Sequence, residues 1–173
     1  GSTAENLDRA VAKGKLDEAG KSSVLERLTG STEREALGGV DVVVEAIAED
    51  LEIKRELFRD LDRIAKPGAI LATTTSSLSI ADLAAQTGRP GDVVGIHFFN
   101  PAPIMKLVEV VSAETTSPEV AETAKALSLN VGKHPVSCGD RAGFIVNALT
   151  PAYENDKRKP NSFDRSLTHR RTL

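Results

Sequence analysis

The chain has 173 residues, of which 40% are hydrophobic and 27% charged, a composition ordinary for one globular domain with its own core. Its formal charge of -3 argues against a nucleic-acid surface as the main function, and no apolar run approaches the roughly 18 residues that a membrane span needs. The one cysteine, Cys138, excludes an internal disulfide and a cysteine-only metal site and fits a cytoplasmic protein, so we expect no metal.

The first part of the chain predicts two helices and a strand between them. Residues 5–29 are predicted to be helical, with breaks near Gly14 and Gly20, where the apolar stripe is interrupted. The Val-rich run over 41–50 is too short for a buried helix, so it predicts a strand buried on both faces. Apolar residues return at helical spacing over 51–65, which predicts the second helix.

The same alternation of strands and helices continues to residue 138. In chain order the sequence predicts a strand over 69–75, a short helix over 79–86, strands over 92–99 and 106–113, a helix over 118–129 that begins at Pro118, and a strand over 132–138. The last strand is predicted to lie at an edge, because Pro135 cannot donate a ladder hydrogen bond. This order predicts an α/β fold with flanking helices and a sheet that is largely parallel in its first part.

The end of the chain differs from the rest. From Thr150 onward the sequence has no apolar period, so it lacks the apolar surface that offsets the entropy of ordering. We predict one folded domain over residues 1–149. For 150–173 we predict a disordered tail, or at most a continued turn of a helix that starts near Gly143.

The residues alone do not name a nucleotide cofactor. A sheet that binds a dinucleotide needs a glycine-rich turn between its first strand and first helix, so that backbone amides meet the pyrophosphate. The sequence contains no G-x-G-x-x-G, and "LGGVD" (37–41) precedes a strand instead of following one.

His97 and Glu109 are the first candidates for catalysis. His97 lies in an apolar strand directly before "FFNPAP", near a strand end, where α/β proteins place their sites. A carboxylate from the next strand, Glu109, can reach the imidazole, fix its tautomer and raise the basicity of the other ring nitrogen. The alternative is a core histidine bonded to a backbone carbonyl, with a solvated glutamate nearby. Both interpretations stay open at this point.

Further polar residues fall at strand ends and helix starts. In "TTTSSLS", Ser76 or Ser77 is expected to cap the helix that follows, and a hydroxyl there also faces the ligand crevice. Asn147 stands near a helix start, where it lowers helix propensity and so hints at a function. Glu49 and Lys54 are interpreted as an exposed pair at a helix start.

Four segments together resemble the L-3-hydroxyacyl-CoA dehydrogenases, NAD-dependent enzymes of fatty-acid oxidation. They are "DVVVEAIAEDLEIKRELFRDLD", "ATTTSSLSI", "GIHFFNPAPIMKLVEVV" and "GKHPVSCGDRAGFIVNAL", in the family's order and approximate spacing. The resemblance covers about residues 5–149 and is nearest to the bacterial 3-hydroxybutyryl-CoA dehydrogenases. It implies an incomplete Rossmann-like sheet, NAD as the cofactor, and oxidation of short-chain L-3-hydroxyacyl-CoA to 3-ketoacyl-CoA.

The resemblance also implies a role for each candidate residue. His97 would take the proton of the substrate 3-hydroxyl as hydride leaves C3, and Glu109 would orient His97 and stabilise its imidazolium. Ser76 and Asn147 would hold the hydroxyl or keto oxygen of the substrate. The implied NAD contacts are Glu49, Lys54, Ser76 and Asn100, and the implied contacts to the CoA phosphates are Lys13 and Lys15.

The sequence departs from the family pattern in three respects. It contains neither the opening glycine motif nor the helical second domain through which family members form homodimers. Thr74 stands where relatives usually carry asparagine. Two alternatives therefore accompany the dehydrogenase prediction: a catalytically inactive fragment, and a related dehydrogenase that acts on a sugar acid. The favoured hypothesis predicts an acyl-CoA as the substrate, and we expect neither a nucleic acid nor a membrane as a partner.

Overall fold

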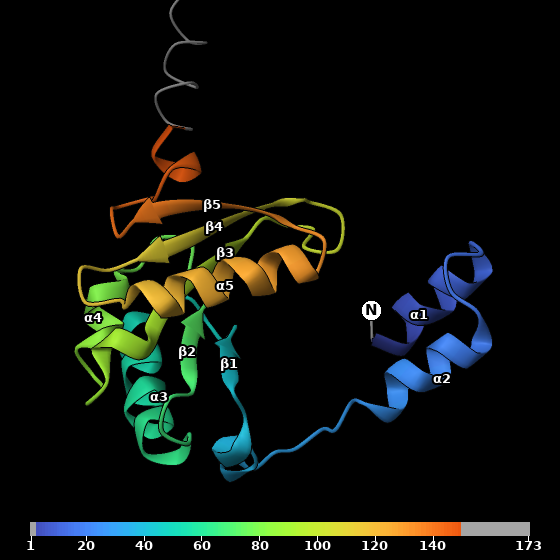
Figure 1. The fold of residues 1–173 in the computed structure, drawn as a ribbon, viewed down its shortest axis with the longest axis horizontal. Coiled ribbons are helices and arrows are strands. Elements are labelled where there is room, and N and C mark those ends of the chain that lie inside the picture. Colours follow the sequence, from blue (N-terminus) through green and yellow to red (C-terminus); the bar gives the residue numbers. More distant parts are fainter. Residues whose placement is uncertain (1–2, 150–173) are drawn as a thin grey trace, which may run out of the picture. The chain divides into compact units, whose positions relative to one another are not determined.

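The computed structural model describes residues 3–149, which fall into two compact units divided between Ala36 and Leu37 (Figure 1). The first unit contains the helices α1 (Thr3–Ala12) and α2 (Glu18–Glu26), and the second contains the sheet. Residues 150–173, for which we predict a divergent tail, lie outside the described residues, so the division at residue 149 stays a prediction.

The two helices of the first unit are separated by one break and not two. Gly14 adopts a φ of +65° in that break, a conformation that favours glycine, as the sequence indicates. The predicted break near Gly20 is wrong, because Gly20 lies inside α2. Its amide donates to Oδ1 of Asp17 (2.7 Å), the N-cap residue at which α2 begins.

The second unit is built on a five-stranded sheet in the order β1-β2-β3-β4-β5 (Figure 1). The first three strands are parallel, β4 runs antiparallel to β3, and β5 runs parallel to β4. The predicted α/β fold and its largely parallel first part are therefore confirmed, and β5 is the edge strand that Pro135 indicates. The strands are β1 (Val42–Glu45), β2 (Ile70–Thr73), β3 (Val93–Phe98), β4 (Leu107–Ser112) and β5 (His134–Gly139).

Helices cover both faces of this sheet. On one face α3 and α4 bury Phe58, Leu61 and Ile80 against strand residues, and on the other face α5 packs chiefly against β3, β4 and β5. The helices of this unit are α3 (Leu51–Ile64), α4 (Ile80–Ala84) and α5 (Pro118–Asn130), with short 3-10 turns η1 (Arg34–Gly39) and η2 (Pro90–Asp92). Among the helices of residues 3–149, none is long and apolar enough to cross a bilayer.

β1 differs from its prediction as a strand buried on both faces over 41–50. It has four residues, and burial alternates along it: Val43 and Glu45 are buried, whereas Val44 is 45% exposed. The prediction is wrong because β1 is an outer strand of the described sheet and α5 packs over the strands at the other side. The buried acidic residue at its end, Glu45, lies where a core strand would carry an apolar side chain.

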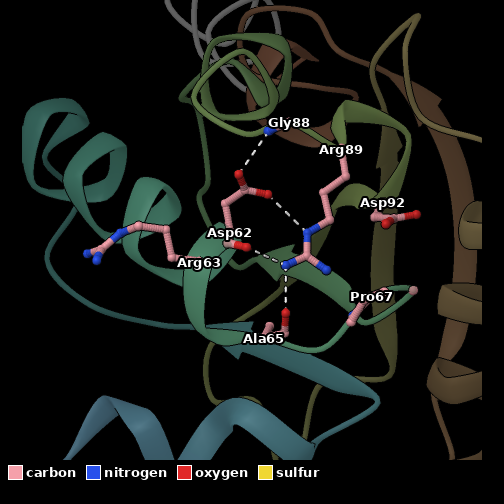
Figure 2. A pocket seen from close by; sticks show the side chains of 8 residues that line it. Asp62, Arg63, Ala65, Pro67, Gly88, Arg89 and Asp92 are labelled. Carbon is pink, nitrogen blue, oxygen red and sulfur yellow. Dashed lines mark hydrogen bonds and ion pairs between the residues drawn. The ribbon is translucent and has the colours of Figure 1, made fainter.

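A pocket opens at the edge of the sheet where β2 and β3 begin (Figure 2). Arg89 is one of the residues that line it and anchors the end of α3. Nε donates to Oδ1 of Asp62 (3.1 Å), and the two Nη atoms donate to the backbone oxygens of Asp62 (2.7 Å), Ala65 (2.8 Å) and Lys66 (2.7 Å). Arg89 therefore satisfies helix-terminal carbonyls that would otherwise have no partner.

Replacement of Arg89 by alanine is expected to lower the free energy of unfolding by about 2–4 kcal/mol, because these charge-assisted bonds to the end of α3 are lost together. Chemical denaturation measures the change. The matched control is Arg63→Ala, since Arg63 lies in the same pocket wall but is 73% exposed and pairs with Asp60. An exposed pair contributes at most about 1 kcal/mol. Equal losses in the two variants would contradict the anchoring role.

Candidate active site

The polar candidates gather where the parallel strands end. Glu49 follows β1, Ser76 follows β2 and Asn100 follows β3, so all three leave the sheet at its carboxyl edge. In an α/β sheet this edge is where ligands bind. The pocket of Figure 2 lies at the opposite edge, where its arginine is committed to backbone carbonyls, and it is not the candidate site.

His97 and Glu109 form a buried pair at this edge. The antiparallel register places them directly opposite each other on β3 and β4, and Nδ1 of His97 lies 2.7 Å from Oε2 of Glu109. His97 is 6% exposed and Glu109 is 1% exposed, so the interpretation of Glu109 as a solvated residue does not hold. Because Nδ1 faces the carboxylate, it carries the ring proton of neutral His97 and leaves Nε2 as a proton acceptor.

The second carboxylate oxygen of Glu109 binds the backbone. Oε1 accepts hydrogen bonds from the amides of Ile145 (3.0 Å) and Val146 (2.9 Å), where a helical turn over 146–149 begins. Both oxygens of the buried carboxylate are thus occupied, one by the imidazole and one by a helix start, where negative charge is favoured. The arrangement fixes the orientation of Glu109 and, through it, that of His97.

The turn before these amides needs an unusual backbone. Gly143 has a φ of +74°, and a Cβ atom on it would lie 2.9 Å from the amide nitrogen of Ala148, so only glycine fits. Phe144 follows with a φ of +50°, is buried, and places its ring 5.8 Å from that of His97. Phe99 covers the imidazole as well, at 4.5 Å between ring centroids. Neither phenylalanine is among the site residues that the sequence predicts.

Three further predicted residues are brought together beside this pair. The amide and hydroxyl of Ser76 donate to Oε1 of Glu49 (2.9 and 3.3 Å), and Nδ2 of Asn147 donates to the backbone oxygen of Ser76 (3.1 Å). Thr75 adds a hydrogen bond of 2.5 Å from its hydroxyl to the same Glu49 oxygen. Glu49, Ser76 and Asn147 therefore form one polar cluster that joins the ends of β1 and β2 to the helical turn over 146–149.

Two expectations about these segments are wrong. The residue that caps α4 is Ser79, whose hydroxyl accepts from the amide of Asp82 (3.2 Å), and neither Ser76 nor Ser77 caps it. Lys54 does not form an exposed pair with Glu49, because its side chain is completely buried and lies 2.5 Å from Glu45. Glu49 lies farther from the Lys54 ammonium, at 3.5 Å.

The burial of Lys54 has a signal in the sequence, which is its place on the apolar face of α3. Lys54 precedes Phe58 and Leu61 at the spacing of one helix face, and all three are buried. Its position on that face turns the ammonium toward the sheet, where the carboxylate of Glu45 receives it.

Glu49 is held as an anion by its neighbours. Burial is the largest single contribution and opposes ionisation, but the hydrogen bonds from Thr75 and Ser76 and the charge of Lys54 outweigh it, so the pKa of Glu49 lies below its ordinary value of 4.5. A carboxyl group with a lowered pKa in the folded state stabilises the fold, fully so above that ordinary value. The stabilisation is lost as the pH falls through the folded-state pKa.

We therefore expect the melting temperature of the wild type to fall more steeply below pH 4.5 than that of the Glu49→Gln variant. Thermal melts recorded from neutral pH downward test this difference. Parallel curves for the two proteins across the acid range would contradict the assignment of Glu49 as an ionised, hydrogen-bonded group.

The other predicted residues are placed as follows. Asn100 is exposed two residues after the end of β3, and Lys13 and Lys15 are exposed in the first unit. Among residues 3–149 there is no group of three or more His, Cys, Asp or Glu side chains that could hold a metal ion.

The comparisons with known proteins agree in one family. The family model for the NAD-binding domain of 3-hydroxyacyl-CoA dehydrogenase matches residues 1–141. The 3-hydroxybutyryl-CoA dehydrogenase of Clostridioides difficile is 44% identical over 145 residues, which are 84% of this chain and 52% of that protein. The 3-hydroxyadipyl-CoA dehydrogenase of Escherichia coli K12 is 45% identical over 150 residues, which are 87% of this chain and 32% of that protein.

Solved structures give the same result. The crystal structure of (S)-3-hydroxybutyryl-CoA dehydrogenase from Ralstonia eutropha matches with a TM-score of 0.85 and 40% identity, covering 88% of this chain and 54% of that one. The Rossmann-like, mostly parallel sheet is thus the sheet of these dehydrogenases, and NAD is the cofactor that the matched domain implies. The chain spans 52% and 32% of the two sequence relatives named above. With the family model matching residues 1–141, the chain belongs to the 3-hydroxyacyl-CoA dehydrogenase family of oxidoreductases.

Proposed function

We propose that this chain carries the catalytic pair of an enzyme that oxidises short-chain L-3-hydroxyacyl-CoA, such as 3-hydroxybutyryl-CoA, to 3-ketoacyl-CoA with NAD. The observation that carries the proposal is the buried pair of His97 and Glu109, joined by a contact of 2.7 Å. A buried imidazole whose Nδ1 binds a carboxylate has the features of a general base, because its Nε2 is left to accept a proton.

The proposed step divides the work among residues of this chain. His97 accepts the proton of the substrate 3-hydroxyl on Nε2, and Glu109 stabilises the imidazolium that forms. Ser76 and Asn147, which are hydrogen-bonded to each other, hold the substrate oxygen, so that negative charge on it is stabilised in either direction of the reaction. NAD, when bound, supplies the acceptor for the hydride that leaves C3.

The donor set at the carboxyl edge fits the nicotinamide half of the cofactor. Glu49 offers a carboxylate, Ser76 a hydroxyl and Asn100 an amide, which suit the hydroxyl and carboxamide groups of a nicotinamide riboside. Lys54 is completely buried, and we propose that it contributes through the charge of Glu49 and not by direct contact. The sequence has no glycine-rich turn for the pyrophosphate, so no residue of this chain is assigned to that group.

The proposal extends to the substrate and to assembly. The named relatives act on 3-hydroxybutyryl-CoA or 3-hydroxyadipyl-CoA by their names, which supports an acyl-CoA over a sugar acid. We assign Lys13 and Lys15 to the CoA phosphates because both are exposed cations. We propose that the whole protein forms a homodimer, as family members do.

The test is NADH oxidation by this chain with acetoacetyl-CoA, with a longer 3-ketoacyl-CoA and with an oxidised sugar acid. Turnover with acetoacetyl-CoA above the other two substrates is the expected result. A chain that melts cooperatively but neither oxidises nor binds NADH would contradict the proposal and support a catalytically inactive fragment. Preference for the sugar acid would overturn the substrate assignment alone.

A further inference from the structure

A fully buried ion pair lies behind the polar cluster of the site. The side chains of Glu45 and Lys54 are both 0% exposed, and Oε1 of Glu45 lies 2.5 Å from Nζ of Lys54. Glu45 ends β1, and Lys54 lies on the first turn of α3, so the pair joins these two elements beside the carboxyl edge of the sheet. Glu45 is not among the residues for which the sequence predicts a role.

Both carboxylate oxygens of Glu45 accept hydrogen bonds. In addition to the ammonium, Oε1 accepts from the amide of Ile47 (2.7 Å), and Oε2 accepts from the hydroxyl of Thr73 at the end of β2 (2.7 Å). The backbone oxygen of Glu45 accepts from the amide of Thr74 (3.0 Å). Glu45 therefore holds both the segment that leads from β1 to Glu49 and the segment that leads from β2 to Ser76.

Two routes lead from this pair to the candidate site. In the first, the hydroxyl of Thr73 donates to Glu45 and accepts from the amide of Thr75 (3.2 Å), and the Thr75 hydroxyl donates to Glu49. In the second, the ammonium of Lys54 lies between Glu45 and Glu49, 2.5 Å from the first carboxylate and 3.5 Å from the second. Both routes end on Glu49, which binds the amide of Ser76.

Compared with apolar side chains of similar volume, a buried ion pair adds little to the free energy of unfolding. Burying two charges costs several kcal/mol per ion, and apolar side chains of similar volume are often equally stabilising in place of a buried pair. Apolar side chains cannot bind the Thr73 hydroxyl or attract the Glu49 carboxylate. These polar links are therefore what the ion pair adds beyond packing.

We propose that Glu45 and Lys54 are positioning residues of the site: through Thr73 and Glu49 they fix the turn after β2 that presents Ser76 to substrate and cofactor. The inference rests on the proposed function for the role of Ser76. It adds that Lys54 acts on the site through the carboxylate of Glu49. Glu45 sets this arrangement by holding the Lys54 ammonium between the two carboxylates.

The test compares the wild type with the double variant Glu45→Met/Lys54→Met, which replaces the pair by apolar side chains of similar length. The free chain is studied by NMR, which follows the amide of Ser76 and the titration of the Glu49 carboxyl. NADH affinity is measured separately. We expect a cooperatively folded variant in which the Ser76 resonance moves, Glu49 titrates at a higher pH because the Lys54 charge is gone, and the Kd for NADH rises about tenfold.

Asp41→Asn is the matched control, since Asp41 precedes β1 and pairs with Lys66 beyond α3 at 2.6 Å, but at the other end of the same two elements. It is expected to leave the Ser76 resonance, the Glu49 titration and NADH affinity unchanged. Thr73→Val is a second variant that removes only the hydroxyl link, and it decides the question if the double variant fails to fold. It is expected to move the Ser76 amide in a folded chain.

If the double variant folds and its Ser76 resonance, Glu49 titration and NADH affinity are unchanged, the pair is structural only. A folded Thr73→Val variant with an unchanged Ser76 resonance would show the same. The NMR readouts need no turnover. The Ser76 resonance and the Glu49 titration can therefore change in the variants even if the wild type neither oxidises nor binds NADH. That result would support the positioning links and overturn only the proposed function.

Discussion

Replacement of His97 by alanine is expected to lower NADH oxidation with acetoacetyl-CoA about 10²- to 10⁴-fold, the range that a positioned general acid or base contributes. The loss follows from the proposed role of His97 in exchanging the proton of the substrate oxygen on Nε2, since its Nδ1 lies 2.7 Å from Glu109. Steady-state rates with both substrates varied measure the effect, which should fall on kcat and leave the KM for NADH nearly unchanged.

His134→Ala is the matched control for this experiment. His134 begins β5, is exposed, and takes no part in the polar cluster, so its removal is expected to leave the rate within a factor of two or so. A His97→Ala chain that is folded and fully active would refute the assignment of the base, whatever cofactor and substrate the chain binds.

Replacement of Glu109 by alanine is expected to damage both stability and catalysis. It leaves the imidazole of His97 and the amides of Ile145 and Val146 without their acceptor in a buried setting, which should lower the free energy of unfolding by about 2–4 kcal/mol. It also releases the orientation of His97, so the rate of NADH oxidation should fall as well. Chemical denaturation and steady-state rates measure the two effects.

Glu109→Gln separates the two effects, because a glutamine retains one oxygen acceptor but has no charge to stabilise an imidazolium. We expect it to recover part of the stability and little of the activity. Glu114→Ala is the control, since Glu114 is exposed just beyond the end of β4. Equal destabilisation by Glu109→Ala and Glu114→Ala would show that the buried hydrogen bonds contribute nothing measurable.

The sequence predicts the sheet well because its strands are apolar runs separated by helical periods. β2, β3 and β4 lie within the predicted ranges, and Pro118 and Pro135 indicate a helix start and an edge strand by what proline cannot do. The sequence also allows the pairing of His97 with Glu109, because the two residues lie in consecutive predicted strands. β3 and β4 follow each other in the chain and are neighbours in the sheet, and residues directly opposite each other in such a pair lie on one face.

What the sequence does not predict depends on long-range placement. The spacing of Lys54 to Phe58 and Leu61 indicates that it lies on the buried face of α3, but it does not identify the partner of its ammonium. That partner, Glu45, belongs to another element, and no propensity or charge pattern shows which carboxylate turns inward. The burial pattern of β1 depends on which helices reach that side of the sheet. The cap of α4 is Ser79 and not Ser76 or Ser77, because the chain makes a further turn, held by Thr75, before the helix begins.

The sharing of Glu109 between an imidazole and two backbone amides couples distant parts of the chain thermodynamically. We expect hydrogen exchange at the amides of Ile145 and Val146 to be slow while the Glu109 carboxylate accepts from them, so these two amides should report on the state of His97 without any label at the histidine. The coupling is reciprocal. A ligand that tightens the contact between His97 and Glu109 changes the protection of the amides at the start of the 146–149 turn. Loosening of that turn changes the affinity of the ligand at His97 by the same factor.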